Sequence, residues 1–271
     1  VGRHFMGLRR DTSRKLQQVL GGQKQIEQGQ RRDVVATILF DLLEAHRALT
    51  ASVRPLIRTA YRLGGAQSMQ EAAIAEGKPQ PAAFVMDDPR LAEALLRREI
   101  RIRSINDTLR RQLAQSLAEG IEKAETVSQM AERVRRQFNV AGERAATIAR
   151  TEVGGAVEDA RQVGRGQAGT PLKSWLWSRK ETGRPWHGQT ETLTTANPIP
   201  NSALFTIART GARTPYPRGP GLSAEDAVNC GCSTLSRYPD DQRDARLLQH
   251  LLSRGFLGDA TLSKDAEHAD Q

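Results

Sequence analysis

Long hydrophobic runs, aromatic residues and cysteines are all scarce in this chain of 271 residues. No stretch approaches the roughly 18 consecutive apolar residues that a membrane-spanning helix needs, so membrane insertion is excluded. Residues 1–10 lack the apolar core of a secretory signal peptide, and synthesis in the cytoplasm is expected. Aromatic residues make up 4% of the chain and hydrophobic residues 38%. This composition favours long helices that pack through Leu, Ile, Val and Ala.

The two cysteines, Cys230 and Cys232, have a single residue between them. Two cysteines cannot form the multi-bridge framework of a small secreted domain. A disulfide between them would close a small and strained ring. The pair is therefore expected either as reduced thiols or as part of a metal site.

Sequence motifs of the common enzyme classes are also missing. The chain shows no Ser-His-Asp order, no phosphate-binding Walker loop, no dinucleotide-binding glycine fingerprint and no His-Glu-x-x-His motif. The glycines between 164 and 169 follow a predicted helix and so mark its end.

Charged residues are plentiful, and the formal net charge is +9. Residues 1–168 contain 28 Lys/Arg against 20 Asp/Glu, whereas residues 169–271 contain 12 against 11. A basic surplus attracts phosphate polymers without regard to sequence, so contact between the first part of the chain and double-stranded DNA is one expectation. An arginine-rich solvated surface explains the same composition.

A long amphipathic helix is predicted from Asp33, because apolar residues recur there at spacings of three and four. Pro55 is expected to kink or divide this helix, and Gly64 and Gly65 to end it. Residues 64–86 are then predicted to form a linker with one short helix at most. Residues 1–32, rich in Gly, Gln and Arg, are expected as a basic arm or a short, loosely connected helix.

A second long helix is predicted after Asp88-Pro89, where Asp caps the helix and Pro takes its first position. Its apolar stripe runs from Leu91 to Ile121, and its opposite face is rich in arginine. That face consists of Arg97, Arg98, Arg101, Arg103, Arg110 and Arg111. It is expected to contact DNA phosphates or an acidic protein surface, with plain solvation as the alternative.

Two further helices are expected before residue 168. One begins with a capping box formed by Thr126 and Gln129, and the other opens near Gly142. After Pro171 a strand is predicted around Trp175, and residues 183–222 are predicted as a loop. A short helix after residue 223, a strand over 230–238 and a helix over 247–256 follow.

The predicted fold is mainly α with a small C-terminal α+β module, in which long helices precede a short, loop-rich antiparallel sheet. The predicted segments are a basic arm (1–32), a helical region and linker (33–86), a long-helix region (87–168), the small module with its Trp strand and Cys-x-Cys pair (169–240), and a C-terminal helix and tail (241–271).

One stretch of the chain resembles a known family. The string INDTLRRQLAQSLAEGIEKAETVSQMAERVRRQF, followed by RAATIARTEVGGAVEDAR, is similar to the Mu F-like head-morphogenesis family, the minor head proteins of tailed bacteriophages. The matching elements, in order, are "ARTE" at 149–152, "AR" at 160–161, the Trp strand, an Arg-x-x-His segment ending at His187, Pro-Gly at 220–221 and Asn-Cys-x-Cys at 229–232. The resemblance covers residues 100–238. Two positions depart from the family: its Asp before the Arg-x-x-His segment is displaced, with Glu181 the nearest carboxylate, and its Arg between the cysteines is Gly231.

The resemblance implies a structural virion protein, not an enzyme, present in few copies inside the capsid at the portal vertex after assembly in the host cytoplasm. The implied partners are the portal protein, double-stranded DNA and the major capsid or scaffolding protein, with no membrane. The implied roles are head morphogenesis, genome packaging and genome ejection.

The residues of the resembling segments fall into two candidate sites. A structural hydrogen-bond and packing network is expected, rather than an ordinary helix surface, from Arg150, Thr151, Glu152, Trp175, Trp177 and Asn229. The tryptophans are expected in the core of the small module rather than as a platform for single-stranded nucleic acid.

His187, Cys230 and Cys232 are the candidates for a metal site, and structural zinc is the cofactor they would suit, with Glu181 or His250 as a fourth ligand. The alternative is a pair of small buried residues and a histidine bonded to the backbone.

Two other functions compete with this interpretation. One is an enzyme acting on nucleic acid or a nucleotide through Arg150, Glu152 and His187. The other is a DNA-binding assembly factor that does not attach to the portal.

Overall fold

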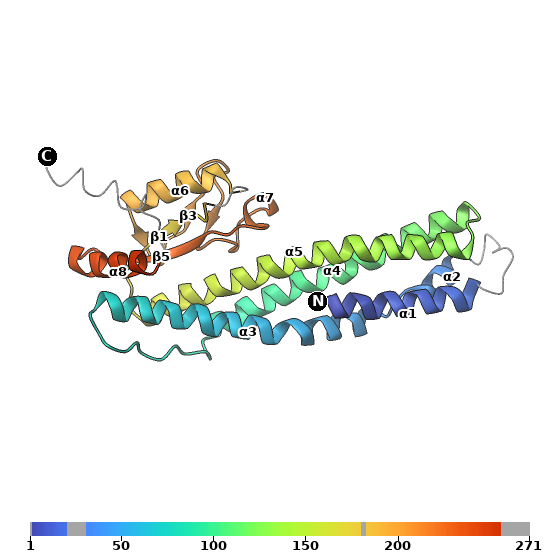
Figure 1. Cartoon of the computed structure of the whole chain (residues 1–271), viewed down its shortest axis with the longest axis horizontal. Coiled ribbons are helices and arrows are strands. Elements are labelled where there is room, and N and C mark those ends of the chain that lie inside the picture. Colours follow the sequence, from blue (N-terminus) through green and yellow to red (C-terminus); the bar gives the residue numbers. More distant parts are fainter. Residues whose placement is uncertain (1, 21–30, 180–182, 256–271) are drawn as a thin grey trace. The chain divides into compact units, whose positions relative to one another are not determined.

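The computed structural model describes residues 2–20, 31–179 and 183–255 of the chain. It confirms a mainly α fold with a small antiparallel sheet near the C-terminal end (Figure 1). Two compact units are present, one formed by Val1–Leu56 with Leu96–Arg150 and the other by Ile57–Leu95 with Thr151–Gln271. We call them unit 1 and unit 2. The two units do not coincide with the predicted segments, because each of the three longest helices contributes residues to both units.

Unit 1 contains α1 (Gly2–Leu20), α2 (Arg31–Ile38) and parts of α3 (Leu42–Ala75), α4 (Pro89–Glu122) and α5 (Val127–Gln167). Its core is mainly aliphatic, and it includes ring contacts between Phe40 and Phe138, at 6.4 Å between centroids, and between His4 and Phe5, at 5.1 Å. Of the two expectations for the start of the chain, the helix holds for residues 2–20 and the basic arm does not. These residues form a helix that buries Phe5, Leu16 and Leu20, since an apolar residue recurs on one side of it.

The single helix predicted from Asp33 is in fact two helices, α2 and α3. Leu39 and Phe40 between them are buried, and the Asp41 carboxylate accepts a hydrogen bond of 2.6 Å from the backbone N–H of Glu44. Asp41 therefore caps the start of α3. Pro55 lies inside α3 without dividing it.

The predicted end of this helix at Gly64 and Gly65 was also wrong, since α3 continues to Ala75. These glycines permit close packing instead of ending the helix. A Cβ added at Gly64 would overlap the carbonyl oxygen of Val157 in α5, and one at Gly65 would overlap the ring of Phe84. Helices that approach this closely require a residue without a side chain at the contact.

The helix starts at Asp88 and Thr126 are confirmed. The Asp88 carboxylate accepts from the backbone N–H of Arg90 at 3.0 Å, and Thr126 exchanges backbone and side-chain hydrogen bonds with Gln129. The separate helix expected from Gly142 was wrong, because α5 runs unbroken over 41 residues. A glycine inside a helix lowers stability by about 1 kcal/mol relative to alanine. This cost is small enough for the packing of the residues on either side to keep α5 continuous through Gly142.

Unit 2 is built on the antiparallel sheet β2-β1-β5, formed by β1 (Leu172–Leu176), β2 (Ile199–Pro200) and β5 (Ser233–Arg237), with a separate pair β3 (Phe205–Thr206) and β4 (Arg213–Thr214). In the β1–β5 register Trp175 lies opposite Thr234. The short helix α7 (Ala224–Ala227) and the closing helix α8 (Asp241–Ser253) lie near their predicted positions. Residue 256 of the predicted helix lies outside the described residues.

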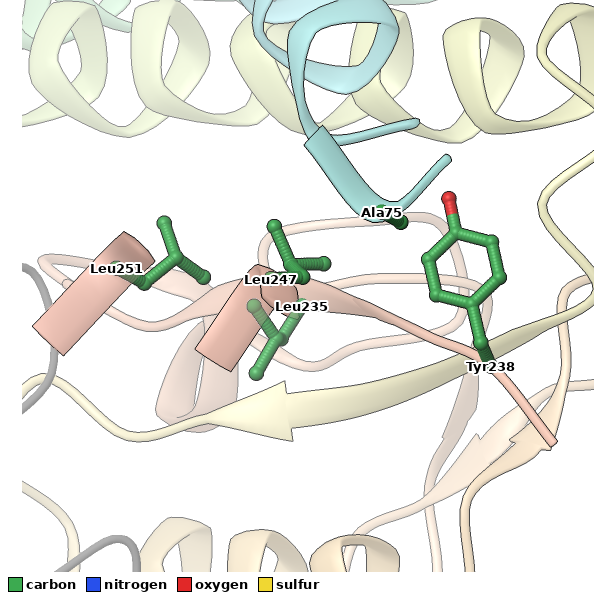
Figure 2. Close-up of a cluster of buried hydrophobic side chains, with 5 residues drawn as sticks. All are labelled: Ala75, Leu235, Tyr238, Leu247 and Leu251. Carbon is green, nitrogen blue, oxygen red and sulfur yellow. The ribbon is translucent and has the colours of Figure 1, made fainter. Parts of the chain in front are cut away.

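Helix α8 packs on the sheet through a hydrophobic cluster (Figure 2). Its members are Ala75, Leu235, Tyr238, Leu247 and Leu251. This cluster joins α8, β5 and the end of α3 within unit 2, and so covers part of a sheet that has too few strands to be stable alone.

The loop expected over residues 183–222 was wrong in part, since it contains α6 (Pro185–Ala196). The residues that α6 buries are His187, Thr190, Glu191 and Thr194, all polar. Thr194 Oγ1 accepts from the backbone N–H of Trp175 at 2.9 Å, and a Glu191 oxygen accepts from that of Trp177 at 3.0 Å. Side chains of α6 thereby accept hydrogen bonds from backbone N–H groups of Trp175 and Trp177, which no strand pairs with on this edge of β1. Within the described residues, no helix combines the length and apolar character needed to cross a bilayer.

We expect Gly64→Ala to destabilise the protein by about 1–3 kcal/mol, because the methyl group would overlap the backbone of α5. Gly142→Ala is the matched control, since an added Cβ there meets nothing within 4 Å, and it is expected to stabilise by up to about 1 kcal/mol. Urea unfolding of both variants measures the difference. Equal effects would contradict the close approach at Gly64.

Candidate functional site

His187, Cys230 and Cys232 come together in unit 2. His187 belongs to α6, and the cysteines lie between α7 and β5. The Nδ1 atom of His187 is 3.6 Å from Cys230 Sγ and 3.5 Å from Cys232 Sγ, and the three candidate ligand atoms all lie within 4.8 Å of one another. The three residues are 1%, 5% and 2% exposed. The sequence prediction that these side chains form one cluster is therefore confirmed.

The backbone around the cysteines is held by Arg218. Its guanidinium donates to the carbonyl oxygen of Cys230 and, at 3.0 Å, to that of Cys232. Gly154 of α5 leaves the space for this side chain, because a Cβ there would stand 2.9 Å from the guanidinium carbon. Asn229, just before the cysteines, has a left-handed backbone with φ of 55°. These features fix the turn that leads both sulfurs toward His187.

The second ring nitrogen of His187 faces a buried carboxylate. Its Nε2 lies 3.4 Å from Asp226 Oδ1, which also accepts from the indole N–H of Trp186 at 2.9 Å. The other Asp226 oxygen accepts from Thr210 Oγ1 at 2.8 Å. Burial raises the pKa of Asp226, but these hydrogen bonds from Trp186, Thr210 and His187 outweigh burial and hold the pKa below its ordinary value. Asp226 is thus an ionised anchor for the histidine ring.

The two thiols affect each other strongly. A hydrogen bond from Cys232 lowers the pKa of Cys230 to about 4, against the opposing effect of burial and with help from His187 and Arg218. The same contact, together with burial, raises the pKa of Cys232 above its ordinary value.

The cavity beside the cluster is very small, about 10 Å³. Its lining comes from His187, both cysteines and the residues Trp177, Ser178, Gly183, Arg184, Asn229 and Gly231. A space of this size accommodates about one water molecule. It leaves no room for a substrate.

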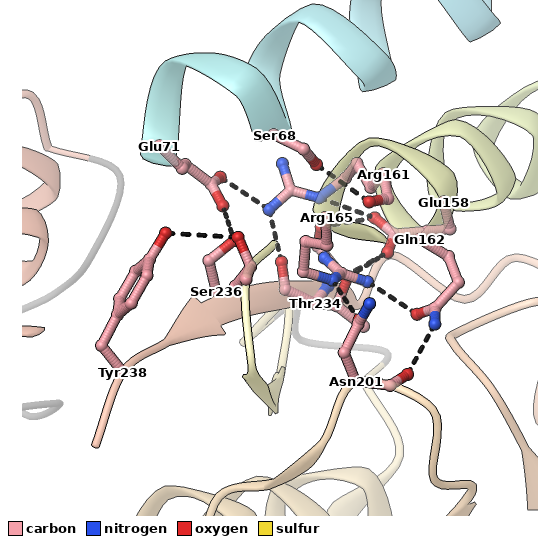
Figure 3. A network of polar contacts seen from close by, with 12 residues as sticks. Ser68, Glu71, Glu158, Arg161, Gln162, Arg165, Asn201, Thr234, Ser236 and Tyr238 are labelled. Carbon is pink, nitrogen blue, oxygen red and sulfur yellow. Dashed lines mark hydrogen bonds and ion pairs between the residues drawn. The ribbon is translucent and has the colours of Figure 1, made fainter. Parts of the chain in front are cut away.

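A network of buried charged residues lies elsewhere in unit 2, where α5 packs on β5 (Figure 3). The Glu158 carboxylate accepts from the backbone N–H of Thr234 at 3.2 Å and from its Oγ1 at 2.6 Å. Arg161 pairs with Glu71 of α3 at 2.7 Å and donates to the carbonyl oxygen of Thr234. Arg165 donates to Thr234 Oγ1 at 2.8 Å.

The network balances its own charge, since two carboxylates face two guanidinium groups. All four side chains are at most 3% exposed. Burial lowers the pKa of Arg161, but Glu71 and Glu158 outweigh it, so the pKa is raised overall. Burial and the neighbouring Arg161 lower the pKa of Arg165 to about 10, which leaves it charged at neutral pH.

The predicted structural network is only partly the one that forms. Thr151 and Glu152 are buried, and Thr151 Oγ1 accepts from the backbone N–H of Asn229 at 3.3 Å. Arg150 is exposed and donates to Thr147 at 3.3 Å, so it stands outside any buried network.

The tryptophans are core residues, as expected. The ring of Trp175 is 1% exposed and packs edge-on against Phe205 and His187, at 5.3 Å from each. Trp177 is partly buried against the same cluster. Their rings serve packing and offer no open platform for stacking bases.

Sequence reasoning missed three network residues, Glu71, Glu158 and Arg165, and also the buried Lys173, which reaches Arg165 through Gln162. Glu158, Arg161 and Arg165 follow one another at helical spacings of three and four, and that spacing was the available signal. Lys173 is fully buried and donates to the carbonyl oxygen of Pro215 at 2.8 Å.

The predicted arginine face of α4 is not uniformly exposed. Arg98 is 2% exposed, which contradicts its assignment to a solvent or partner surface. The helix turns this side chain inward. Arg97 and Arg110 are half-buried, the latter donating to the carbonyl oxygen of Phe40. Arg101, Arg103 and Arg111 are exposed.

The two suggested fourth metal ligands do not complete the cluster. His250 lies in the last turn of α8 and does not belong to the group around His187. Glu181 lies outside the described residues.

Comparison of the chain with protein-family models, with curated proteins and with solved structures finds no match. The similarity to the Mu F-like family accordingly rests on the ordered motifs quoted above.

We expect Arg161→Met to destabilise the protein by about 3–5 kcal/mol, because it removes the ion pairs to Glu71 and Glu158 and leaves two buried carboxylates facing Arg165 alone. Arg150→Met, on the exposed surface of the same helix, is the control and should change stability by less than about 0.5 kcal/mol. Urea unfolding followed by circular dichroism measures both. A small effect at Arg161 would show that the network contributes little.

The burial of Lys173 should make the stability of the protein depend on pH. Burial, with repulsion from Arg165, lowers the pKa of Lys173 to about 7. Between pH 7 and about 10 the unfolded chain therefore binds more protons than the folded one, so stability should rise with pH across this range. In Lys173→Met this contribution should vanish, leaving a flatter profile. Parallel unfolding curves at several pH values provide the measurement, and identical pH profiles would refute the burial effect.

Proposed function

We propose that this chain is a minor head protein of a tailed bacteriophage, which binds near the portal and acts in head morphogenesis, DNA packaging or genome delivery. The observation that carries the proposal is the convergence of the motif residues that give the family resemblance. Arg161, Trp175, His187 and the two cysteines come from separate stretches of the chain, yet all are buried in unit 2.

Their contacts link these stretches physically. Arg161 reaches the backbone of β5, the ring of Trp175 packs on His187, and His187 faces both sulfurs. An ordered set of motifs whose members pack together specifies a folded module. The cavity of about 10 Å³ beside them leaves little room for a substrate at this cluster.

The competing enzyme hypothesis has less support from the geometry. It requires Arg150, Glu152 and His187 to act on one substrate. Neither Arg150 nor Glu152 lines the cavity beside His187.

Unit 1 carries surface features that suit a protein partner. Leu96 and Ile100, four residues apart on α4, are 61% and 66% exposed. Arg101 and Arg103 are exposed close by on the same helix. Exposed apolar residues beside cations are typical of a contact surface for an acidic protein or, through the arginines, for DNA. The portal protein is the partner that the resemblance implies.

The test is co-purification with the portal protein encoded by the same phage genome. We expect the wild-type chain to bind portal rings, and the double variant Leu96→Asp with Ile100→Asp to bind at least about 10-fold more weakly, since each buried apolar side chain contributes about 1.5–3 kcal/mol. Leu193→Asp on α6 is the control, because Leu193 is 60% exposed but lies in unit 2.

Three outcomes separate the hypotheses. Portal binding that the α4 variant weakens supports the proposal. DNA binding without portal binding favours the assembly factor that does not attach to the portal. Absence of the chain from purified virions and proheads would contradict the proposal.

A further inference from the structure

We propose that His187, Cys230 and Cys232 bind one zinc ion through Nδ1 and the two Sγ atoms. This site goes beyond the proposed function and does not depend on it. It is assigned from the positions of the three side chains and from the residues that orient them.

The spacing of the candidate ligands matches tetrahedral zinc. Zinc lies about 2.3 Å from thiolate sulfur and about 2.0–2.1 Å from imidazole nitrogen, so a tetrahedral angle places sulfur and nitrogen about 3.6 Å apart. The two distances from His187 Nδ1 to the sulfurs are 3.6 and 3.5 Å. Both sulfurs are thus already at ligand spacing from the same nitrogen.

The orientation of His187 is that of a metal ligand. Zinc-binding histidines usually donate their other ring N–H to a carboxylate, which fixes the tautomer and the ring. Asp226 occupies this position at Nε2, and it is fixed by Trp186 and Thr210. The Nδ1 lone pair is then directed at the two sulfurs. A histidine that merely filled space in the core would not require a buried, doubly anchored carboxylate behind it.

Charge and space both fit the ion. Two thiolates, a neutral imidazole and Zn²⁺ sum to zero, so the complex can be buried without an unpaired charge. Zinc favours four ligands, and the described residues supply three. The cavity of about 10 Å³ has room for one water molecule as the fourth.

Two other interpretations of the cluster are less consistent with the geometry. A cysteine nucleophile with a His-Asp pair needs access to substrate, whereas both cysteines are at most 5% exposed and the cavity holds about one water. Simple apolar packing accounts for the burial of the cysteines beside Trp175 and Phe205. It does not account for the equal distances of both sulfurs from Nδ1.

The first experiment uses the full chain purified under reducing conditions without chelator. Elemental analysis is expected to find one zinc per chain. After exchange into Co²⁺, we expect a thiolate-to-cobalt absorption band with the visible bands of tetrahedral cobalt. Because the chain has only two cysteines, such a band can come only from Cys230 and Cys232.

Matched variants identify the ligands and their support. Cys232→Ser should abolish the thiolate band or halve it, and Asp226→Asn should weaken metal affinity about 10–100-fold in a competitive chelator titration. His250→Gln, a histidine outside the cluster, should leave zinc content and affinity unchanged. The wild-type cobalt spectrum tests the proposal even if a variant fails to fold.

A folded wild-type chain that contains no zinc and gives no thiolate–cobalt band would overturn the proposal. So would a Cys232→Ser variant that keeps the wild-type zinc content and affinity. Rapid alkylation of one thiol in metal-free, folded protein would favour the nucleophile instead. None of these results bears on portal binding, so failure of this site and failure of the proposed function are distinguishable.

Discussion

The buried charge network of α5 is the interaction on which unit 2 depends. The sheet has only three short strands, and such a sheet needs packing against other elements to be stable. Glu158 and Arg161 satisfy backbone groups of Thr234 in β5, and Glu71 brings α3 into the same network. Since each of these charges is desolvated, each needs its partner in place. The network therefore couples formation of the sheet to packing of the long helices.

The position of the His-Cys-Cys cluster follows from that coupling. Cys232 directly precedes β5, so the contacts that hold β5 also hold this cysteine. His187 is placed by α6, whose polar side chains bond to the backbone of β1. Two adjacent strands thus bring together ligands that lie more than forty residues apart in the sequence. Elements that are themselves held by buried contacts position such a cluster precisely.

The sequence predicted features set by local chemistry. Helix starts at Asp88 and Thr126 follow from capping, and the fold class follows from periodicity that changes from helical to strand-like after Pro171. The cluster of His187 with the cysteines was anticipated from residue type and motif resemblance. The capping and periodicity signals each lie within a short stretch of sequence, and the cluster is indicated by histidine and cysteine, which are rare in this chain.

The features that escaped prediction depend on contacts between distant segments. Gly64 and Gly65 resemble helix stops until α5 and Phe84 are seen against them. Helix α6 turns polar residues inward, so no apolar periodicity marks it. Arg98 resembles its exposed neighbours in sequence, although the helix buries it.

The hydrogen bonds from Trp175 and Trp177 to α6 also affect whether strands of other chains can pair with the sheet. An unpaired strand edge is a template for pairing with strands of other chains. Thr194 and Glu191 occupy the edge of β1 with side-chain oxygens, so no incoming strand can bond there while α6 is folded. Helix α6 therefore protects the module from edge-to-edge aggregation. Local unfolding of α6 would expose this edge and would be the first step toward such aggregation.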